Sequence, residues 1–215
     1  MLDRRHFSGW LAAAAVAGPV AAAAQAQAGP VQGKDYARLP RPLPTPAGDK
    51  IEVVEFFWYG CPHCNALEPL LDAWVKALPA DVAFRRAPVA FRRDPFVAHQ
   101  KLYYALETMG LVERLHGEVF AAIHRGGQRL SQLSDIQAFV ARHGVDPAKF
   151  AEVFASFAVQ SKARQAQQLS DAYAIDGVPA LGVHGRTFTS GTLAGPPQRM
   201  LQVADYLIAQ VRRSR

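Results

Sequence analysis

The chain is organised around a strand that leads directly into two cysteines and then into a helix. An apolar run of strand type ends at Gly60, and the only two cysteines of the sequence, Cys61 and Cys64, follow it. Beyond Cys64, large apolar residues recur every three or four positions as far as Leu78, which is typical of a buried helix face. The pattern therefore predicts that both sulfurs lie at a helix N-terminus, where free backbone N–H groups and the helix dipole stabilise a thiolate.

The N-terminal residues 1–28 have the features of an export signal rather than of a folded domain. An arginine pair at positions 4 and 5 precedes an alanine-rich apolar run, and Ala26-Gln27-Ala28 fits a small-residue cleavage site. The run is short for a transmembrane span, and no later stretch is long enough. We expect cleavage before Gly29 and export to an oxidising compartment, where disulfides persist. The arginine pair leaves both the general and the twin-arginine export routes open.

A cysteine pair with this spacing has three readings in an exported protein. A zinc site would need further ligands at short spacing, but the chain has no other cysteine and its histidines lack that spacing. A structural disulfide would close only a very short loop here, and the stabilisation from chain entropy grows with loop length. We therefore favour the third reading, a redox-active dithiol, which requires no metal and no further cofactor.

The order of the residues assigns different tasks to the two thiols. Cys61 comes first and is expected to face solvent and to react, whereas Cys64, one turn later, is expected to be shielded and to act as the resolving thiol. His63 can place a positive charge or an N–H donor beside Cys61. Pro62 suits the first helical turn, where no N–H bond is lost. A stabilised thiolate stabilises the reduced protein and makes the disulfide a stronger oxidant.

Two further features are candidates for the site. Glu55 interrupts the apolar strand six residues before Cys61, so its carboxyl is expected to be buried beneath Cys64 and to exchange a proton with it. Arg86 on the next strand is a candidate ion partner. In Gly177-Val178-Pro179, the glycine permits a sharp turn and the X-Pro bond at a strand start is a candidate for the cis form, but these residues leave the isomer open.

Patterning along the chain predicts an α/β domain that is interrupted by helices. Strands are expected at 51–57 and 82–89 with the helix between them, which makes these two strands parallel. Residues 34–39 are a candidate edge strand. After the helical stretch come a long helix, a short strand, a hairpin at Gly185 and a final helix. The predicted division is 29–93 with the two cysteines, 94–156 as a helical insertion, and 157–215 with the proline turn.

One helix boundary inside the insertion is predicted from local signals. Ser134 has the side chain of an N-cap, Asp135 would then lie in the first turn, and Gly144 follows the last apolar residue. We expect a helix over 134–142 that is capped by Ser134.

The positive charge of the chain raises the question of nucleic-acid binding. The formal net charge is +6 and the pI is about 9.6. However, Arg85-Arg86, Arg92-Arg93 and Arg212-Arg213 are scattered, and no motif that combines aromatic and basic residues accompanies them. We expect solvated surface charge and no nucleic-acid partner.

Taken together, these motifs resemble the DsbA family of periplasmic thiol:disulfide oxidoreductases. The likeness is carried by the Cys-Pro-His-Cys stretch after a strand, the helical insertion, and Gly-Val-Pro before a hairpin and a terminal helix. It extends to Gly33-Lys34-Asp35-Tyr36, Glu55-Phe56-Phe57 and Ser156-Phe157. The resemblance implies a thioredoxin fold, a central mixed sheet flanked by helices, with an inserted all-helical domain.

The same resemblance implies a role for each site residue. Cys61 would form mixed disulfides and Cys64 would resolve them, with Pro62 and His63 tuning the potential. Glu55 matches the buried acid of the family, and Pro179, preceded by Val178, matches its cis-proline. Three positions depart from the family pattern: Gly182, His184 and Arg86, the last in place of a lysine.

The implied function is the donation of the Cys61–Cys64 disulfide to reduced or unfolded proteins that have just been exported to the periplasm. A membrane oxidase of the DsbB type would reoxidise the dithiol, and the chain would act as a monomer. The alternatives are a disulfide isomerase or reductase, and a peptide-binding chaperone in which the redox chemistry is incidental.

Overall fold

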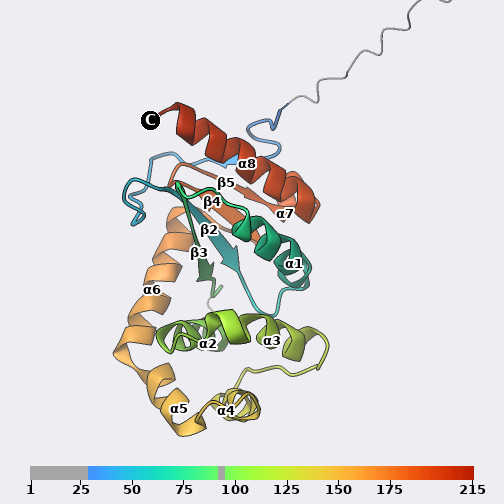
Figure 1. Cartoon of the computed structure of the whole chain (residues 1–215), viewed down its shortest axis with the longest axis vertical. Helices are drawn as coiled ribbons and strands as arrows, with labels where there is room; N and C mark the ends of the chain where they lie inside the picture. The colour runs from blue at the N-terminus through green and yellow to red at the C-terminus, as the bar shows by residue number, and fades with distance from the viewer. Residues whose placement is uncertain (1–28, 92–94) are drawn as a thin grey trace, which may run out of the picture.

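The computed structural model describes residues 29–91 and 95–215, in which a mixed sheet lies between helices and a helical unit lies at one end (Figure 1). The predicted export signal, residues 1–28, and the pair Arg92-Arg93 lie outside the described residues. The strands are β1 (Ala37–Arg38), β2 (Ile51–Phe57), β3 (Val82–Pro88), β4 (Ala180–Val183) and β5 (Thr187–Ser190). The helices are α1 (Pro62–Lys76), α2 (Phe96–Thr108), α3 (Val112–His124), α4 (Leu133–Arg142), α5 (Pro147–Ala155), α6 (Phe157–Ala172), α7 (Gly191–Ala194) and α8 (Pro197–Arg213).

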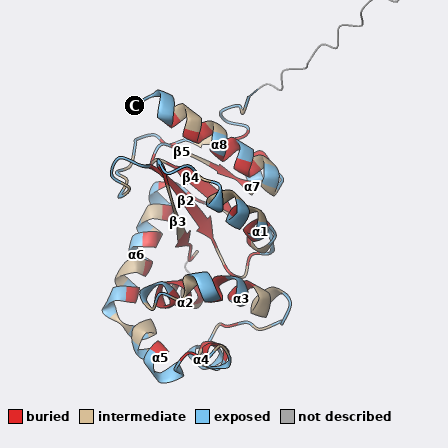
Figure 2. Cartoon of the chain, viewed as in Figure 1, coloured by how far each residue is buried: buried red, intermediate tan, exposed pale blue. Residues whose placement is uncertain are grey.

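The sheet has the order β1-β5-β4-β2-β3. Strands β2 and β3 are parallel, as expected for a strand–helix–strand unit, whereas the other neighbours pair antiparallel. Every residue of β2 is buried, which Figure 2 shows as a continuous red arrow. A strand covered on both faces explains why its sequence is an almost unbroken apolar run.

The two faces of β2 contact different helices because its side chains alternate. Ile51 and Val53 belong to a hydrophobic cluster with α1 and α8, whereas Val54 and Phe56 pack toward the end of α6. Glu55 follows Val53 on the face toward α1. This register places one carboxyl group inside an otherwise apolar interior.

Helices α2 to α5 occupy the chain between β3 and α6, and this stretch contains no strand among its described residues. They lie at the end of the sheet near the start of α1 (Figure 1). Their core is continuous with the cysteines, because Phe57, Tyr59, Cys61 and Cys64 belong to the same hydrophobic cluster as the buried faces of these helices. The helical unit therefore forms one wall of the region around the thiols.

Helix α6 connects the helical unit to the sheet. Ser156 caps it, with the Ser156 side chain accepting a hydrogen bond from the Val159 N–H group at 3.3 Å. Val159 and Ala163 pack into the core of the helical unit, whereas Leu169, further along, packs against the sheet. A single helix thus belongs to both cores.

The predicted cap of α4 is wrong. The helix begins at Leu133, Gln132 occupies the N-cap position without a side-chain hydrogen bond, and Ser134 lies exposed inside the first turn. Local signals placed the start one residue late, because here the backbone carbonyl of Gln132 accepts the Asp135 and Ile136 N–H groups without help from a serine. The predicted end is confirmed, since Gly144 follows with a φ of 71°.

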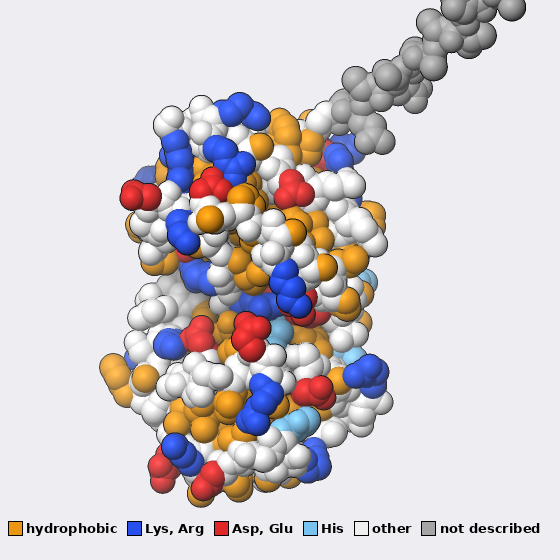
Figure 3. Space-filling model, viewed as in Figure 1, with side chains coloured by type: hydrophobic (Ala, Val, Ile, Leu, Met, Phe, Trp, Pro, Cys, Tyr) orange, Lys and Arg blue, Asp and Glu red, His pale blue; other side chains and the backbone are white. Residues whose placement is uncertain are grey.

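The surface shows no gathering of basic side chains on the face drawn in Figure 3, where Lys and Arg are scattered among acidic groups. Arg212 pairs with Asp81 at 2.8 Å and Arg85 pairs with Glu52 at 2.8 Å. Within the described residues, no helix is both long and apolar enough to cross a membrane.

Candidate active site around the cysteine pair

Cys61 is the N-cap residue of α1, and Pro62 occupies the first turn. The turn before it is tight, because a Cβ atom on Gly60 would lie 2.3 Å from the Trp58 ring. Both cysteines are free thiols in this structure, which therefore has the dithiol form. The expectation that Cys61 faces solvent is wrong for this form, because the residue is only 7% exposed, between α1 and the proline turn, whereas Cys64 is fully buried, as predicted.

The pKa of Cys61 is lowered to about 6. The largest cause is a hydrogen bond from the Cys64 thiol, which outweighs the opposing effect of burial; the backbone N–H groups of Cys64 and His63 and the charge of the His63 ring contribute further. The Cys64 N–H group lies 3.4 Å from the Cys61 sulfur. The exposed His63 ring thus acts in the predicted direction, but it is the smallest of these contributions.

Cys64 behaves in the opposite way. Burial raises the pKa of its thiol, and the hydrogen bond and charge of Cys61 add to this, with a smaller contribution from Glu55 when that group is ionised. Because one thiol ionises easily and the other resists ionisation, the pair is chemically unequal: Cys61 is the thiolate and Cys64 keeps its proton.

Glu55 is fully buried, as predicted, and the ion partner suggested by the sequence is also present. The Arg86 Nε atom lies 3.0 Å from the Glu55 Oε2 atom, from the directly opposite position on β3. The contact lacks the alignment of a hydrogen bond. Burial, followed by the negative charge of Glu68, raises the pKa of Glu55, and Arg86 only partly opposes this. Glu55 therefore holds its proton more tightly than an ordinary carboxyl group.

Three further residues of this buried cluster escaped the sequence analysis: Glu68, Tyr59 and His116. Arg86 Nη2 donates a hydrogen bond to Glu68 at 3.1 Å, and His116 Nε2 lies 3.3 Å from the same carboxyl oxygen. Glu68 could have been noticed, because it follows Cys64 by one helical turn on the buried face of α1. His116 carried no such signal, since its partners lie on elements far away in sequence.

The proline turn lies beside Cys61. The Val178–Pro179 peptide bond is cis. The Cys61 sulfur lies 3.4 Å from the Val178 carbonyl oxygen, to which it donates a hydrogen bond when it carries its proton, so the two motifs meet. Next to them is a cavity of about 350 Å³, whose lining includes His63, Pro179 and Met200. Gly177, which we also predicted as part of the binding surface, does not line this cavity.

Two of the departures from the family pattern lie away from this cavity. Gly182 is buried against α6, where a Cβ atom would come within 2.6 Å of the Tyr173 ring. His184 and Gly185 form the β4–β5 turn with φ angles of 49° and 62°. Neither residue therefore shapes the surface beside Pro179.

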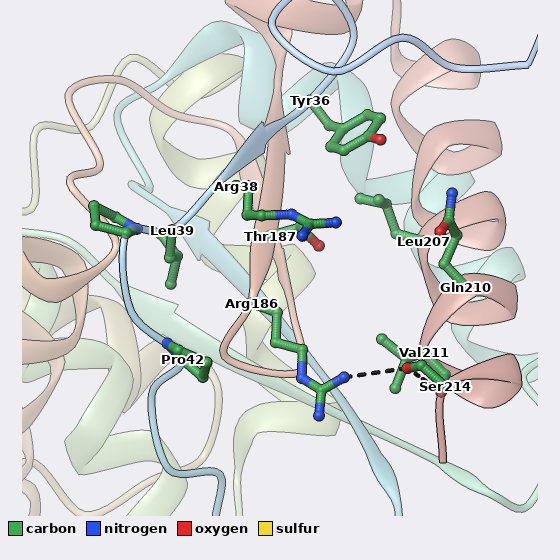
Figure 4. Close-up of a pocket in the computed structure, with 11 residues that line it drawn as sticks. Tyr36, Arg38, Leu39, Pro42, Arg186, Thr187, Leu207, Gln210, Val211 and Ser214 are labelled. Carbon is green, nitrogen blue, oxygen red and sulfur yellow. Dashed lines mark hydrogen bonds between the residues drawn. The ribbon is translucent and has the colours of Figure 1, made fainter.

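A second cavity, of about 410 Å³, lies between α8 and the edge formed by β1 and β5 (Figure 4). Arg38 and Arg186 flank it and Leu207 lines its apolar side, but neither cysteine reaches it. No group of three or more His, Cys, Asp or Glu side chains in residues 29–91 and 95–215 is arranged to hold a metal ion.

Comparison with known proteins gives the same answer as the geometry. Residues 52–207 match a family model described as DSBA-like thioredoxin domain. The thiol:disulfide interchange protein DsbA of Pseudomonas syringae pv. tomato is 44% identical over 94% of this chain and 92% of its own length. The protein of the same name from Azotobacter vinelandii is 44% identical over 84% of each chain.

The structural comparison agrees. The crystal structure of Pseudomonas aeruginosa DsbA matches with a TM-score of 0.82 and 40% identity, covering 86% of this chain and 95% of that one. This confirms the predicted thioredoxin fold with its helical insertion. The chain belongs to the DsbA family of thiol:disulfide oxidoreductases.

Proposed function

We propose that this protein donates the Cys61–Cys64 disulfide to reduced or unfolded proteins newly exported to the periplasm. The observation that carries the proposal is the inequality of the two thiols. An acidic Cys61 favours the dithiol over the disulfide, and a protein whose reduced form is stabilised is an oxidant. The two sulfurs accept both electrons themselves, so the reaction needs no other cofactor.

The transfer takes place in two displacement steps. A substrate thiolate attacks the Cys61 sulfur, the Cys61–Cys64 bond breaks, and the electron pair leaves on Cys64. Cys64 then takes up a proton from Glu55, since a buried thiolate is unfavourable there. A second substrate thiolate attacks the substrate sulfur of the mixed disulfide and releases Cys61 as a thiolate. The substrate gains a disulfide and the protein gains two electrons; the proton on Cys64 came from Glu55, which is left as a carboxylate.

The neighbouring residues support this sequence of steps in different ways. Pro62 starts the helix without losing an N–H bond, and His63 adds positive charge beside Cys61. The backbone at Val178 offers a carbonyl group next to the reacting sulfur, and the cavity beside Pro179 offers an apolar surface for an extended substrate segment. Gly177 would allow the turn that presents this edge.

A membrane oxidase of the DsbB type would reoxidise the dithiol, and the chain would act as a monomer. Reoxidation begins with the Cys61 thiolate and ends when Cys64 attacks the mixed disulfide. For this attack Cys64 must lose the proton that it gained during substrate oxidation, and Glu55 can take it back.

The direction of transfer is tested by equilibrating the mature protein with glutathione and by assaying the oxidation of a reduced test protein. We expect an oxidising midpoint, no catalysis by Cys61→Ser, and accumulation of mixed disulfides on Cys61 in Cys64→Ser. A strongly reducing midpoint would instead assign the protein to disulfide reduction or isomerisation. Full cellular function of a variant with both cysteines replaced by alanine would instead assign it to peptide binding without redox chemistry.

A further inference from the structure

The charged cluster beneath the thiols contains more groups than the disulfide transfer uses. The proposed transfer assigns proton donation to Glu55 alone, yet Glu68 and His116 are also buried, at 8% and 6% exposure. Burying such groups is costly unless they compensate one another. Packing alone therefore does not explain why Glu68 and His116 are buried together in this cluster.

The contacts form a chain from α3 to β3. The Tyr59 hydroxyl lies 2.8 Å from His116 Nδ1, and His116 Nε2 lies 3.3 Å from Glu68 Oε2, a charge contact without the alignment of a hydrogen bond. Burial raises the pKa of Tyr59, so the phenol keeps its proton and is available as a donor to Nδ1 of His116. When the hydroxyl donates to Nδ1, the imidazole carries its own proton on Nε2, which faces Glu68.

Glu55 and Glu68 compete for one cation. Arg86 contacts Glu55 at 3.0 Å and Glu68 at 3.1 Å, while a third carboxylate, Asp72, takes part of its charge at 2.9 Å. Two buried carboxyl groups in such a site do not both ionise easily. A donor that contacts only one of them decides which one carries the negative charge.

We propose that His116, from the helical insertion, is a positioning residue for the dithiol: its Nε2–H group holds the negative charge on Glu68, so that the proton of the carboxyl pair stays on Glu55, beneath Cys64. This inference rests on the proposed function, in which Glu55 supplies a proton to Cys64. It gives the insertion a part in the reaction that is separate from contacting substrate.

The charges around the pair are consistent with this assignment. Burial alone would raise the pKa of Glu68, but His116 lowers it, with a further contribution from Arg86. The pKa of Glu55, which His116 does not contact, is raised. The other titratable groups facing the cluster are Asp72 and Cys64 on α1, Tyr59 after β2, and Tyr103 on α2.

The test is a titration of the two carboxyl groups by ¹³C NMR in the oxidised protein, with Glu55→Gln and Glu68→Gln to assign the signals. In His116→Phe, which keeps an aromatic ring but no donor, we expect the Glu55 midpoint to fall and the Glu68 midpoint to rise, each by about one pH unit. His116→Gln retains an N–H group and is expected to restore part of the difference.

His124→Phe is the matched control. This histidine also lies on α3 and also contacts Tyr59, but through the Tyr59 carbonyl oxygen at 2.8 Å and not through Glu68. We expect neither carboxyl midpoint to move. If His116→Phe does not fold, Tyr59→Phe removes a single oxygen atom from the same chain of contacts and is expected to shift the midpoints in the same directions by less.

Unchanged midpoints in the folded His116 or Tyr59 variant, or a shift of both carboxyl groups in the same direction, would overturn the inference. The link to the thiols is tested by the rate at which dithiothreitol reduces the Cys61–Cys64 disulfide at pH 7. We expect it to be about tenfold slower in His116→Phe than in His124→Phe, and equal rates would also overturn the inference. Neither readout depends on the oxidation of protein substrates, so the proposed function can fail or hold independently.

Discussion

The face of β2 that packs toward α1 borders two different parts of the protein core, one apolar and one charged. At its start, Ile51 and Val53 lie in an apolar cluster with α1 and α8. Toward its end, Glu55 lies in a cluster of charges with Arg86 and Glu68. The β2 residues of both regions are buried, and they are close neighbours along the same strand. One is built from dispersion and apolar burial, the other from groups that must neutralise one another.

This difference separates the part of the core that serves stability from the part that serves chemistry. An apolar interior can lose or gain a methyl group without altering the ionisation of a distant thiol. The charged interior couples protonation to stability, because each group sets the charge state of the next. The following predictions, from the largest expected effect to the smallest, test this separation.

The largest effect is expected from Arg86→Leu. The change leaves Glu68 buried without its cation, so the free energy of unfolding should fall by about 3–5 kcal/mol. Urea unfolding measures it. The control is Arg212→Leu, because Arg212 pairs with Asp81 at the surface and its removal should leave the unfolding midpoint almost unchanged. Equal losses in the free energy of unfolding of the two variants would show that the buried ion pairs contribute no more than a surface pair.

A cavity in the apolar region should cost stability without touching the chemistry. Leu207 on α8 is 2% exposed. We expect Leu207→Ala to lower the free energy of unfolding by about 2–5 kcal/mol, while the thiolate absorbance of Cys61 still titrates with a midpoint of about 6. A clear shift of that midpoint would show that the apolar region also affects the ionisation of Cys61.

The contribution of the charged region to the free energy of unfolding should depend on pH. Because the folded pKa of Glu55 is raised, its contribution to stability is present below the unfolded pKa and is lost as pH rises toward the folded value. Glu55→Gln removes this loss. The variant should therefore gain on the wild type by about 1.4 kcal/mol per pH unit between those two pKa values, measured by urea unfolding of the oxidised proteins. A constant difference across pH would contradict the raised pKa of Glu55.

The smallest effect concerns the ranking of influences on Cys61. The Cys64 thiol is the largest cause of the lowered Cys61 pKa, and the charge of the His63 ring is the smallest of those identified. Absorbance titration of the thiolate should therefore show a larger rise of the midpoint in Cys64→Ala than in His63→Ala. The reverse order would mean that the exposed ring, and not the buried thiol, controls the reactive sulfur.

Much of this architecture could be predicted from sequence because its signals are local. The apolar run of β2, the spacing along α1 and the position of Cys61 at its start follow from residues that are neighbours in the chain. Glu55 was recognisable as a charge within an apolar strand, and Arg86 as a basic residue on the next one. The start of α4 was misplaced because backbone hydrogen bonds alone can begin a helix where a serine also stands nearby.

The part that could not be predicted depends on contacts between distant segments. Tyr59 and His116 are 57 residues apart and meet only because the insertion folds back over the end of the sheet. No periodicity in α3 distinguishes His116 from an ordinary buried residue. The role of Gly182 was equally hidden, since its partner Tyr173 lies on the opposite side of the proline turn in sequence.

The complete burial of Cys64 has a consequence for what becomes of stalled adducts. Thiols from outside can add only at Cys61, so an adduct that fails to progress always has the same unreacted sulfur directly behind it. Its removal by Cys64 is then a first-order event within one molecule, whose rate is independent of the concentration of every other thiol in the compartment.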